Sequence, residues 1–141
     1  MAAQNLVRLA VLSGNDKWRT RADQLIEGVL SAAADNLVSH AALLNALDLR
    51  LRGAEIVVTG QGATADALLA AARALPYTNR MVLAAPNAAV LSPSHPARGK
   101  IASAPSGAAF VCVAERCSLP VTQPDKIAEA LAGMRIGQQL A

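Results

Sequence analysis

The 141-residue chain has few aromatic residues, which make up 2% of it: Trp18, Tyr77 and Phe110. Proteins that stack bases or sugar rings usually need more aromatic side chains than this, so such sites are not expected. The basic residues are not clustered either. The net charge is +3, but the Lys and Arg residues form neither a run nor a helical stripe. Because a nucleic-acid interface needs such clustering, we expect no nucleic-acid partner.

Long apolar stretches are also missing. No run of 18 apolar residues occurs, which is the length that a membrane-spanning helix needs. The first residues, MAAQNLVRLAVLSGND, are interrupted by Arg8 and lack the charged lead and long apolar core of a signal peptide. We therefore predict no membrane partner and a cytoplasmic location, where paired cysteines are usually reduced.

The chain shows no recognisable Ser-His-Asp arrangement, no paired carboxylates and no phosphate-binding loop with its lysine. We therefore predict no catalytic residue and no cofactor for this chain alone. Hydrophobic residues, by contrast, make up 53% of the sequence, which is enough for a core. Many of them are alanines, which favour helix more than they add buried area.

The first third of the chain has the hydrophobic periodicity of three helices. We predict these helices over residues 3–12, from 15 or 16 to 33, and over 40–51. Asn15 and Asp16 are good N-caps for the second helix, and Ser39 can cap the third. Gly53 is a stop signal after the third helix. Three such helices could form a bundle or an incomplete helical array.

The hydrophobic period changes after residue 53, where continuous apolar runs rich in β-branched residues begin. Such runs are typical of strands that are buried on both faces. The predicted order is a strand at 55–60, a helix at 64–74, a strand at 81–85, a loop at 86–108 with one helical turn at 88–91, strands at 109–113 and 118–121, and a helix at 125–134 that Pro124 begins. The first strand-helix-strand unit requires a parallel pair. We therefore expect an α/β fold with a helical segment, residues 1–52, and a small α/β layer, residues 53–141.

The segment GQGATA, residues 60–65, follows a predicted strand and opens a predicted helix. It fits the loose G-x-G-x-x-A form of the dinucleotide fingerprint, whose glycines let the backbone approach a pyrophosphate at the helix N-terminus. That fingerprint also expects an acidic residue about twenty positions later. Here the next strand ends in AAPN, residues 84–87, with no carboxylate. We favour a tight turn capped by Thr64, and nucleotide binding at Gly60, Gly62 and Thr64 is the alternative.

The two histidines of the chain are candidate ligands or catalytic groups. His40 lies in the first turn of a predicted helix beside Ser39, where it could project into a sugar or cofactor pocket. His95 lies in a Ser-His-Pro loop and is expected to be solvated. Both histidines and both cysteines could form a zinc site, since four N or S ligands suffice. That site would require two distant histidines to converge on one hairpin, so we predict no metal site.

The segment FVCVAERCSLPVT, residues 110–122, holds both cysteines of the chain. If Ala114 and Glu115 form a two-residue turn, Cys112 faces Cys117 in a non-hydrogen-bonded pair with Cα atoms about 4.5 Å apart. That separation lies inside the disulfide range of about 4.4–6.8 Å. However, Ala-Glu suits a primed turn poorly, because that turn prefers Asn or Gly. We favour buried, reduced cysteines, and a redox or metal-binding pair is the alternative.

The amino-acid sequence of these segments resembles the C-terminal region of the thioredoxin-domain-containing YyaL/spermatogenesis-associated family. The matching pieces are LVRLAVLSGNDKWRTRA, SHAALL (residues 39–44), EIVV (55–58), GK (99–100), FVC (110–112) and CSLPVT (117–122). The likeness covers nearly the whole chain, and the string aromatic-Val-Cys, four residues, Cys-x-x-Pro is its most specific part. The family usually has Tyr where this chain has Phe110, which removes a hydroxyl.

Proteins of that family join a thioredoxin-like domain to an (α/α)₆ toroid like that of N-acylglucosamine 2-epimerases. The resemblance implies that residues 1–52 are the last helices of such a toroid and that the partner is the rest of a larger protein or a second copy. The family's redox motif lies in the thioredoxin-like domain, so no catalytic residue is carried over. His40, Cys112 and Cys117 do match residues in the sequences of that family. The resemblance thus implies a structural or interaction role.

Overall fold

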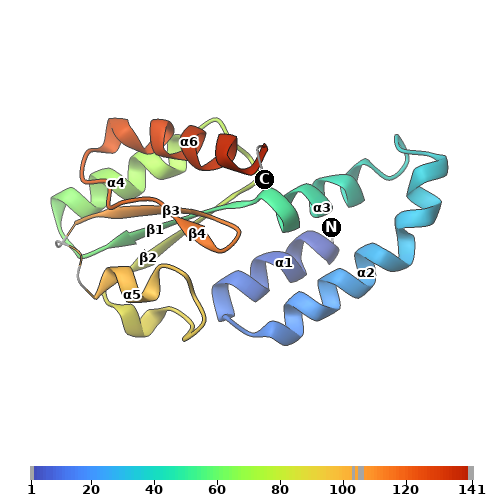
Figure 1. The fold of residues 1–141 in the computed structure, drawn as a ribbon, viewed down its shortest axis with the longest axis horizontal. Helices are drawn as coiled ribbons and strands as arrows, with labels where there is room; N and C mark the ends of the chain where they lie inside the picture. The colour runs from blue at the N-terminus through green and yellow to red at the C-terminus, as the bar shows by residue number, and fades with distance from the viewer. Residues whose placement is uncertain (1, 103, 105–106, 140–141) are drawn as a thin grey trace. The chain divides into compact units, whose positions relative to one another are not determined.

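The computed structural model describes residues 2–102, 104 and 107–139, and it divides into two compact units, Met1–Gly53 and Ala54–Ala141 (Figure 1). The first unit is helical, and the second combines helices with a mixed sheet. The predicted α/β class is therefore confirmed. No helix in these residues has the length and hydropathy that crossing a membrane requires.

The first unit contains the helices α1 (Ala2–Ser13), α2 (Asp16–Asp35) and α3 (Ala41–Arg52), close to the predicted bounds. Asn15 caps α2 as predicted, because its side chain accepts the N–H of Lys17 at 3.0 Å. The predicted Ser39 cap is wrong. His40 holds the N-cap position of α3 without a side-chain cap bond, while the side chain of Asn36 accepts the N–H of Ser39 at 3.2 Å.

The interior of this first unit is built mainly from small side chains. Its described buried residues are Ala3, Val7, Ala10, Ala22, Ile26, Ala33, Ala46 and Leu49. Arg50 of α3 also forms a bidentate ion pair with Asp23 of α2, with Nε–Oδ1 at 2.8 Å and Nη2–Oδ2 at 3.0 Å. Because alanines bury little apolar area, the three helices approach closely but form only a thin core.

The second unit is organised around a four-stranded sheet in the order β2-β1-β3-β4. Its strands are β1 (Ala54–Thr59), β2 (Arg80–Ala85), β3 (Ala109–Val113) and β4 (Arg116–Cys117). The predicted parallel pair is confirmed, because β1 runs parallel to β2. Strand β3 then pairs antiparallel with β1 and with β4. Strand β1 is buried along almost its whole length, as its continuous apolar run predicted.

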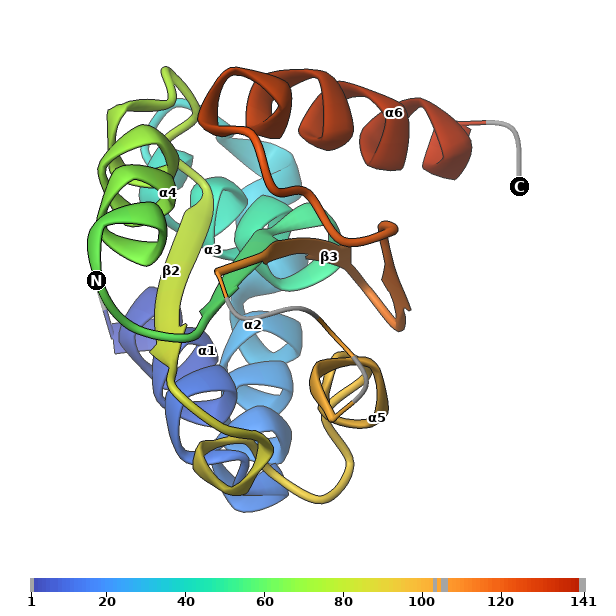
Figure 2. The same cartoon turned by 90° about the vertical axis from the view of Figure 1, so that its left-hand side faces the viewer.

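Two helices cover one face of this sheet (Figures 1 and 2). They are α4 (Ala63–Ala74), which links β1 to β2, and α6 (Ile127–Gln139), which follows the short 3-10 helix η2 (Pro124–Lys126). Their apolar residues Leu68 and Ile127 pack with Ile56, Val58 and Val111 of the strands. Period-two alternation sends these strand residues to one face and their neighbours to the other.

The opposite face is covered by the connection from β2 to β3 (Figures 1 and 2). This segment carries the 3-10 helix η1 (Ala88–Val90) and the one-turn helix α5 (Arg98–Ile101). The turn of helix near residues 88–91 was predicted, but α5 was not. Leu91 and Ile101 from this segment pack against Val57, Phe110 and Cys112. We call residues 86–102 the covering segment.

The last predicted strand, residues 118–121, is wrong. Strand β4 comprises Arg116–Cys117, and Val121 forms a single bridge to Ala109. The ladder is interrupted because the N–H of Val111 donates to the Ser118 hydroxyl at 3.1 Å instead of to a backbone carbonyl. Between this point and the Val121 bridge the second strand has one residue more than β3, which is the pattern of a β-bulge.

Candidate functional site

The two cysteines lie opposite each other in the β3–β4 hairpin. Ala114 and Glu115 form a two-residue turn, which the sequence left open: Val113 pairs with Arg116, and Cys112 pairs with Cys117. Their Cα atoms are 4.0 Å apart, and their sulfurs are joined in a disulfide. The interpretation as buried, reduced cysteines is therefore wrong. It rested on the usual redox state of a compartment, whereas the strand register brings the two thiols within bonding distance.

The turn forms although its sequence is unfavourable. Ala114 adopts a φ of 54°, in the left-handed region that glycine occupies most easily. A positive φ at the first turn residue is a feature of primed hairpin turns, whose twist matches that of the strands. The hairpin therefore imposes this conformation on an alanine, and the Cys112–Cys117 register follows from it.

The two sulfurs have different surroundings. Cys112 is 1% exposed and belongs to the apolar cluster beneath the covering segment, with Val57 and Phe110 among its members. Cys117 is partly exposed and lies on β4, which is at one edge of the sheet. Cys117 is thus the less deeply buried of the two cysteines, although it also packs against this apolar cluster.

A buried acid–histidine pair lies on the same face of the sheet. Glu55 of β1 is the direct register partner of Cys112, so both side chains point to the face under the covering segment. Its Oε2 lies 2.9 Å from Nε2 of His95, and the His95 side chain is only 6% exposed. The prediction of a solvated His95 is therefore wrong.

The proton positions in this pair follow from a second hydrogen bond. The N–H of Ala97 points at Nδ1 of His95 at a distance of 3.1 Å, so Nδ1 accepts. His95 must then carry its proton on Nε2 and donate it to the Glu55 carboxylate. Both ring nitrogens are thus engaged, and the pair attaches the covering segment to β1.

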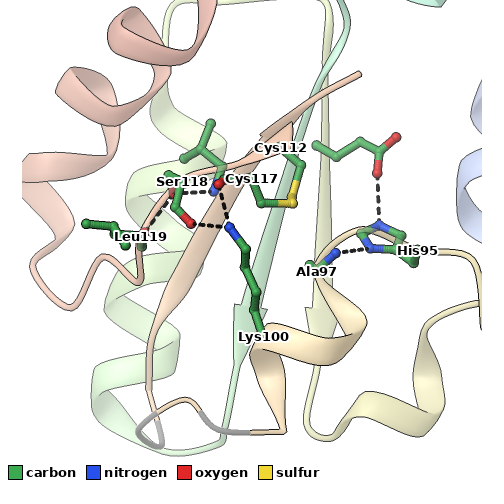
Figure 3. The surroundings of a disulfide bond; sticks show 9 residues. His95, Ala97, Lys100, Cys112, Cys117, Ser118 and Leu119 are labelled. Carbon is green, nitrogen blue, oxygen red and sulfur yellow. Dashed lines mark hydrogen bonds and ion pairs between the residues drawn. A yellow bond between two sulfur atoms is a disulfide. The ribbon is translucent and has the colours of Figure 1, made fainter. Parts of the chain in front are cut away.

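A lysine connects the covering segment to the hairpin. In Figure 3 Lys100 extends from α5 toward Cys117 and Ser118. Its ammonium donates to the carbonyl of Cys117 at 2.6 Å and to that of Ser118 at 3.3 Å. The ammonium of Lys100 is therefore bound to the backbone of Cys117, whereas Glu55 is the cross-strand neighbour of Cys112.

Only one of these neighbours of the disulfide could have been expected from the sequence. Glu55 is a lone carboxylate at the start of a strand predicted to be buried, and a buried charge needs a partner. Lys100 carried no comparable signal. Its part in the site depends on α5, a four-residue helix that periodicity does not detect.

The zinc alternative loses its sulfur ligands, because a disulfide cannot supply thiolates. Within residues 2–102, 104 and 107–139, no group of three or more His, Cys, Asp or Glu side chains is arranged to hold a metal ion.

The predicted turn at residues 60–64 joins β1 to α4. Gly60 and Gly62 have φ values of 82° and 89°, and Gly62 is the N-cap of α4. The predicted Thr64 cap is wrong, because no side chain caps this helix. Thr64 instead lies close to Gly107, where an added Cβ would be 3.0 Å from its Cγ2 atom. Thr64 thus packs against the chain that enters β3.

The residue that follows β2 at the position of a ribose-binding carboxylate has another role. Asn87 caps η1, because its side chain accepts the N–H of Ala89 at 3.0 Å. The structure therefore adds no group that favours nucleotide binding at Gly60, Gly62 and Thr64, and this alternative stays a prediction.

The candidate pocket residues Ser39 and His40 lie in the turn between α2 and α3. Nδ1 of His40 is 2.9 Å from the carbonyl of Asn36, to which it donates. Ser39 is exposed, and its N–H is held by the side chain of the same asparagine. Both residues thus take part in closing a turn, and a pocket at this point stays a prediction.

No protein-family model, no curated protein and no solved structure matches this chain. The family resemblance therefore stays a prediction that rests on the quoted residues.

Proposed function

We propose that this chain is an interaction module of a larger, cytoplasmic thioredoxin-domain-containing protein, without catalysis of its own. Its helical unit would join further helices of an α/α array. The observation that carries this proposal is the large number of big apolar side chains that the helical unit exposes.

The exposed large apolar residues are distributed unequally between the two units. The described residues of the helical unit include Leu9, Leu12, Trp18, Leu25, Leu30, Leu37, Val38 and Leu51, whereas those of the sheet unit include Val90 and Leu119. Single exposed apolar residues are common, but a concentration of them is typical of an interaction surface. The apolar residues that the helical unit buries are thus mainly alanines, and the large apolar residues that it exposes are mainly leucines.

The apolar residues of α2 show that its own unit does not cover all of the apolar surface of this helix. Ala22 and Ile26 form the centre of its buried stripe. Trp18 and Leu25, which are seven residues apart, lie along one edge of that stripe, and Leu30 lies along the other. The apolar arc of α2 is therefore wider than the part that is covered.

The occupant that fits such a surface is another amphipathic helical layer. The resemblance supports helices of a parent protein, which would continue the array. When the chain is purified alone, a second copy is the available source of the same kind of surface. The proposal therefore predicts that the isolated chain self-associates through its helical unit.

Light scattering over a concentration series tests this prediction. The wild-type chain should increase in apparent mass with concentration, and Leu25→Glu should shift this increase to higher concentrations, because it places a charge on the edge of α2 that also carries Trp18. Leu119→Glu is the matched control, since Leu119 is 83% exposed but belongs to the sheet unit. A wild-type chain that stays monomeric at all concentrations, or equal effects of the two variants, would contradict the proposal.

A further inference from the structure

We propose that Cys112–Cys117 is a reversible dithiol–disulfide exchange site. An external dithiol attacks Cys117, Cys112 is the leaving thiol, and the second thiol of the reductant resolves the mixed disulfide. This role goes beyond the docking of the helical unit and depends on different residues. Three features support this assignment: the unequal exposure of the two cysteines, the unequal charge around them, and a hairpin that holds its shape without the disulfide.

Access favours attack at Cys117. It lies on the edge strand β4 and is partly exposed, whereas Cys112 is 1% exposed beneath the covering segment. Thiol–disulfide exchange requires a thiolate to approach one sulfur along the S–S axis, so the accessible sulfur decides where attack occurs. An external thiolate thus reaches Cys117 first.

Charge favours the same assignment. The ammonium of Lys100, 2.6 Å from the carbonyl of Cys117, stabilises negative charge near that residue. The carboxylate of Glu55, the register partner of Cys112, disfavours negative charge at the buried sulfur. In the reduced hairpin these neighbours favour Cys117 over Cys112 as the attacking thiol.

The hairpin does not depend on the disulfide for its register. The N–H of Ser118 donates to the carbonyl of Val111 at 2.9 Å, and Ala109 and Val121 exchange two backbone hydrogen bonds at 2.7 and 2.8 Å. These bonds keep the two thiols facing each other after reduction. The disulfide can therefore open and close without unfolding of the sheet.

The exchange is a balanced two-electron reaction. A thiolate of the dithiol forms a bond to Sγ of Cys117, and the Cys112–Cys117 bond breaks with its electron pair on Sγ of Cys112, which takes a proton from solvent. The second thiol of the reductant loses its proton and attacks the reductant sulfur of the mixed disulfide. This step releases Cys117, which is protonated in turn. The protein gains two electrons and two protons, and the dithiol becomes a disulfide.

The paired thiols also select the class of reductant. A monothiol would leave a mixed disulfide at Cys117, next to Cys112, whose Cα is 4.0 Å from that of Cys117. At this separation the effective concentration of Cys112 is high, so it displaces the monothiol and restores the original bond. Only a reductant that resolves its own mixed disulfide completes the reaction, and this requires a second thiol.

The first test uses the native wild-type chain. It is treated with dithiothreitol or with glutathione at equal thiol concentration, alkylated, and weighed by mass spectrometry while far-UV circular dichroism follows the fold. Full reduction by the dithiol with an unchanged spectrum, together with little reduction by glutathione, is the expected result. Reduction that requires denaturant, or equal reduction by both reagents, would overturn the proposal. An added arm with a purified dithiol oxidoreductase distinguishes a protein reductant, which acts faster than dithiothreitol at equal concentration, from a small dithiol.

The second test separates the two sulfurs with a matched pair of variants. Cys112→Ala leaves only Cys117, and Cys117→Ala leaves only Cys112. The aromatic disulfide reagent DTNB should react at least about tenfold faster with Cys112→Ala, because its remaining thiol is accessible and lies beside Lys100. Equal rates, or faster reaction of Cys117→Ala, would show that the assignment is wrong. Circular dichroism of both variants establishes that the comparison is between folded proteins.

Discussion

Among the individual residues, Ala114 carries the clearest conformational strain. Its φ of 54° lies in a region that costs an L-residue roughly 1–2 kcal/mol relative to glycine. Glycine loses more backbone entropy on folding, which offsets part of that gain. We therefore expect Ala114→Gly to raise the free energy of unfolding by about 0.5–1 kcal/mol, measured by urea denaturation.

The same exchange in a helix should have the opposite effect. Ala70 is exposed in the middle of α4, so Ala70→Gly should lower the free energy of unfolding by about 1 kcal/mol. If both variants lost the same free energy of unfolding, the positive φ of Ala114 would not be a source of strain.

The candidate site could be predicted only in part at this level of detail. The register that places Cys112 opposite Cys117 follows from the period of two and the length of the turn. The bonding state does not follow from spacing, and the buried partnership of His95 with Glu55 joins residues 40 positions apart. Long-range side-chain pairs of this kind leave little trace in local sequence patterns.

Among the secondary-structure elements, the approach of the β3 entry to α4 depends on one glycine. Gly107 has a φ of 81°, and a Cβ there would lie 3.0 Å from Cγ2 and 3.1 Å from Cβ of Thr64. Gly107→Ala should therefore lower the free energy of unfolding by about 1–3 kcal/mol, through backbone strain and the displacement of Thr64. Thermal or urea denaturation measures this change.

Gly133 provides the control for this substitution within the same unit. It lies in α6, and an added Cβ would meet no heavy atom within 4 Å. Gly133→Ala should therefore raise the free energy of unfolding by up to about 1 kcal/mol, because alanine favours the helix. A neutral or stabilising Gly107→Ala would contradict the close approach of residues 107 and 64.

The elements show which patterns in the sequence were reliable. The longer helices could be predicted because each has a sustained period, and strands β1 to β3 because each is a continuous apolar run. Helix α5 could not, since its four residues are too few for a periodic signal. The residues after Cys117 could not be placed correctly either, because the Ser118 hydroxyl takes a backbone donor that a regular ladder would use.

The disulfide also acts at the scale of single elements, because it cross-links one hairpin. It joins residues with a sequence separation of 5, and the chain-entropy relation gives about 2 kcal/mol of stabilisation for so short a loop. The hairpin hydrogen bonds between Val111 and Ser118 and between Ala109 and Val121 remain without it. This small contribution agrees with a bond that opens while the fold persists.

For the molecule as a whole, the two units differ in how well they bury their apolar residues. The sheet unit has apolar clusters on both faces of its sheet, whereas the helical unit has a thin core and many exposed leucines. The helical spacing of the apolar residues predicted the helices themselves. It could not predict which side of each helix is covered, because that depends on neighbours that local periodicity does not specify.

The single tryptophan of the chain lies on the surface that we propose to be covered. Trp18 is 40% exposed at the edge of the buried stripe of α2. Its fluorescence, followed over a concentration series with acrylamide as quencher, reports directly on whether a partner covers that surface. We predict that the emission shifts to shorter wavelength and that quenching weakens as the concentration rises, in the wild type and in Leu119→Glu but less in Leu25→Glu. Emission and quenching that stay constant from dilute to concentrated protein would contradict the proposed interaction role.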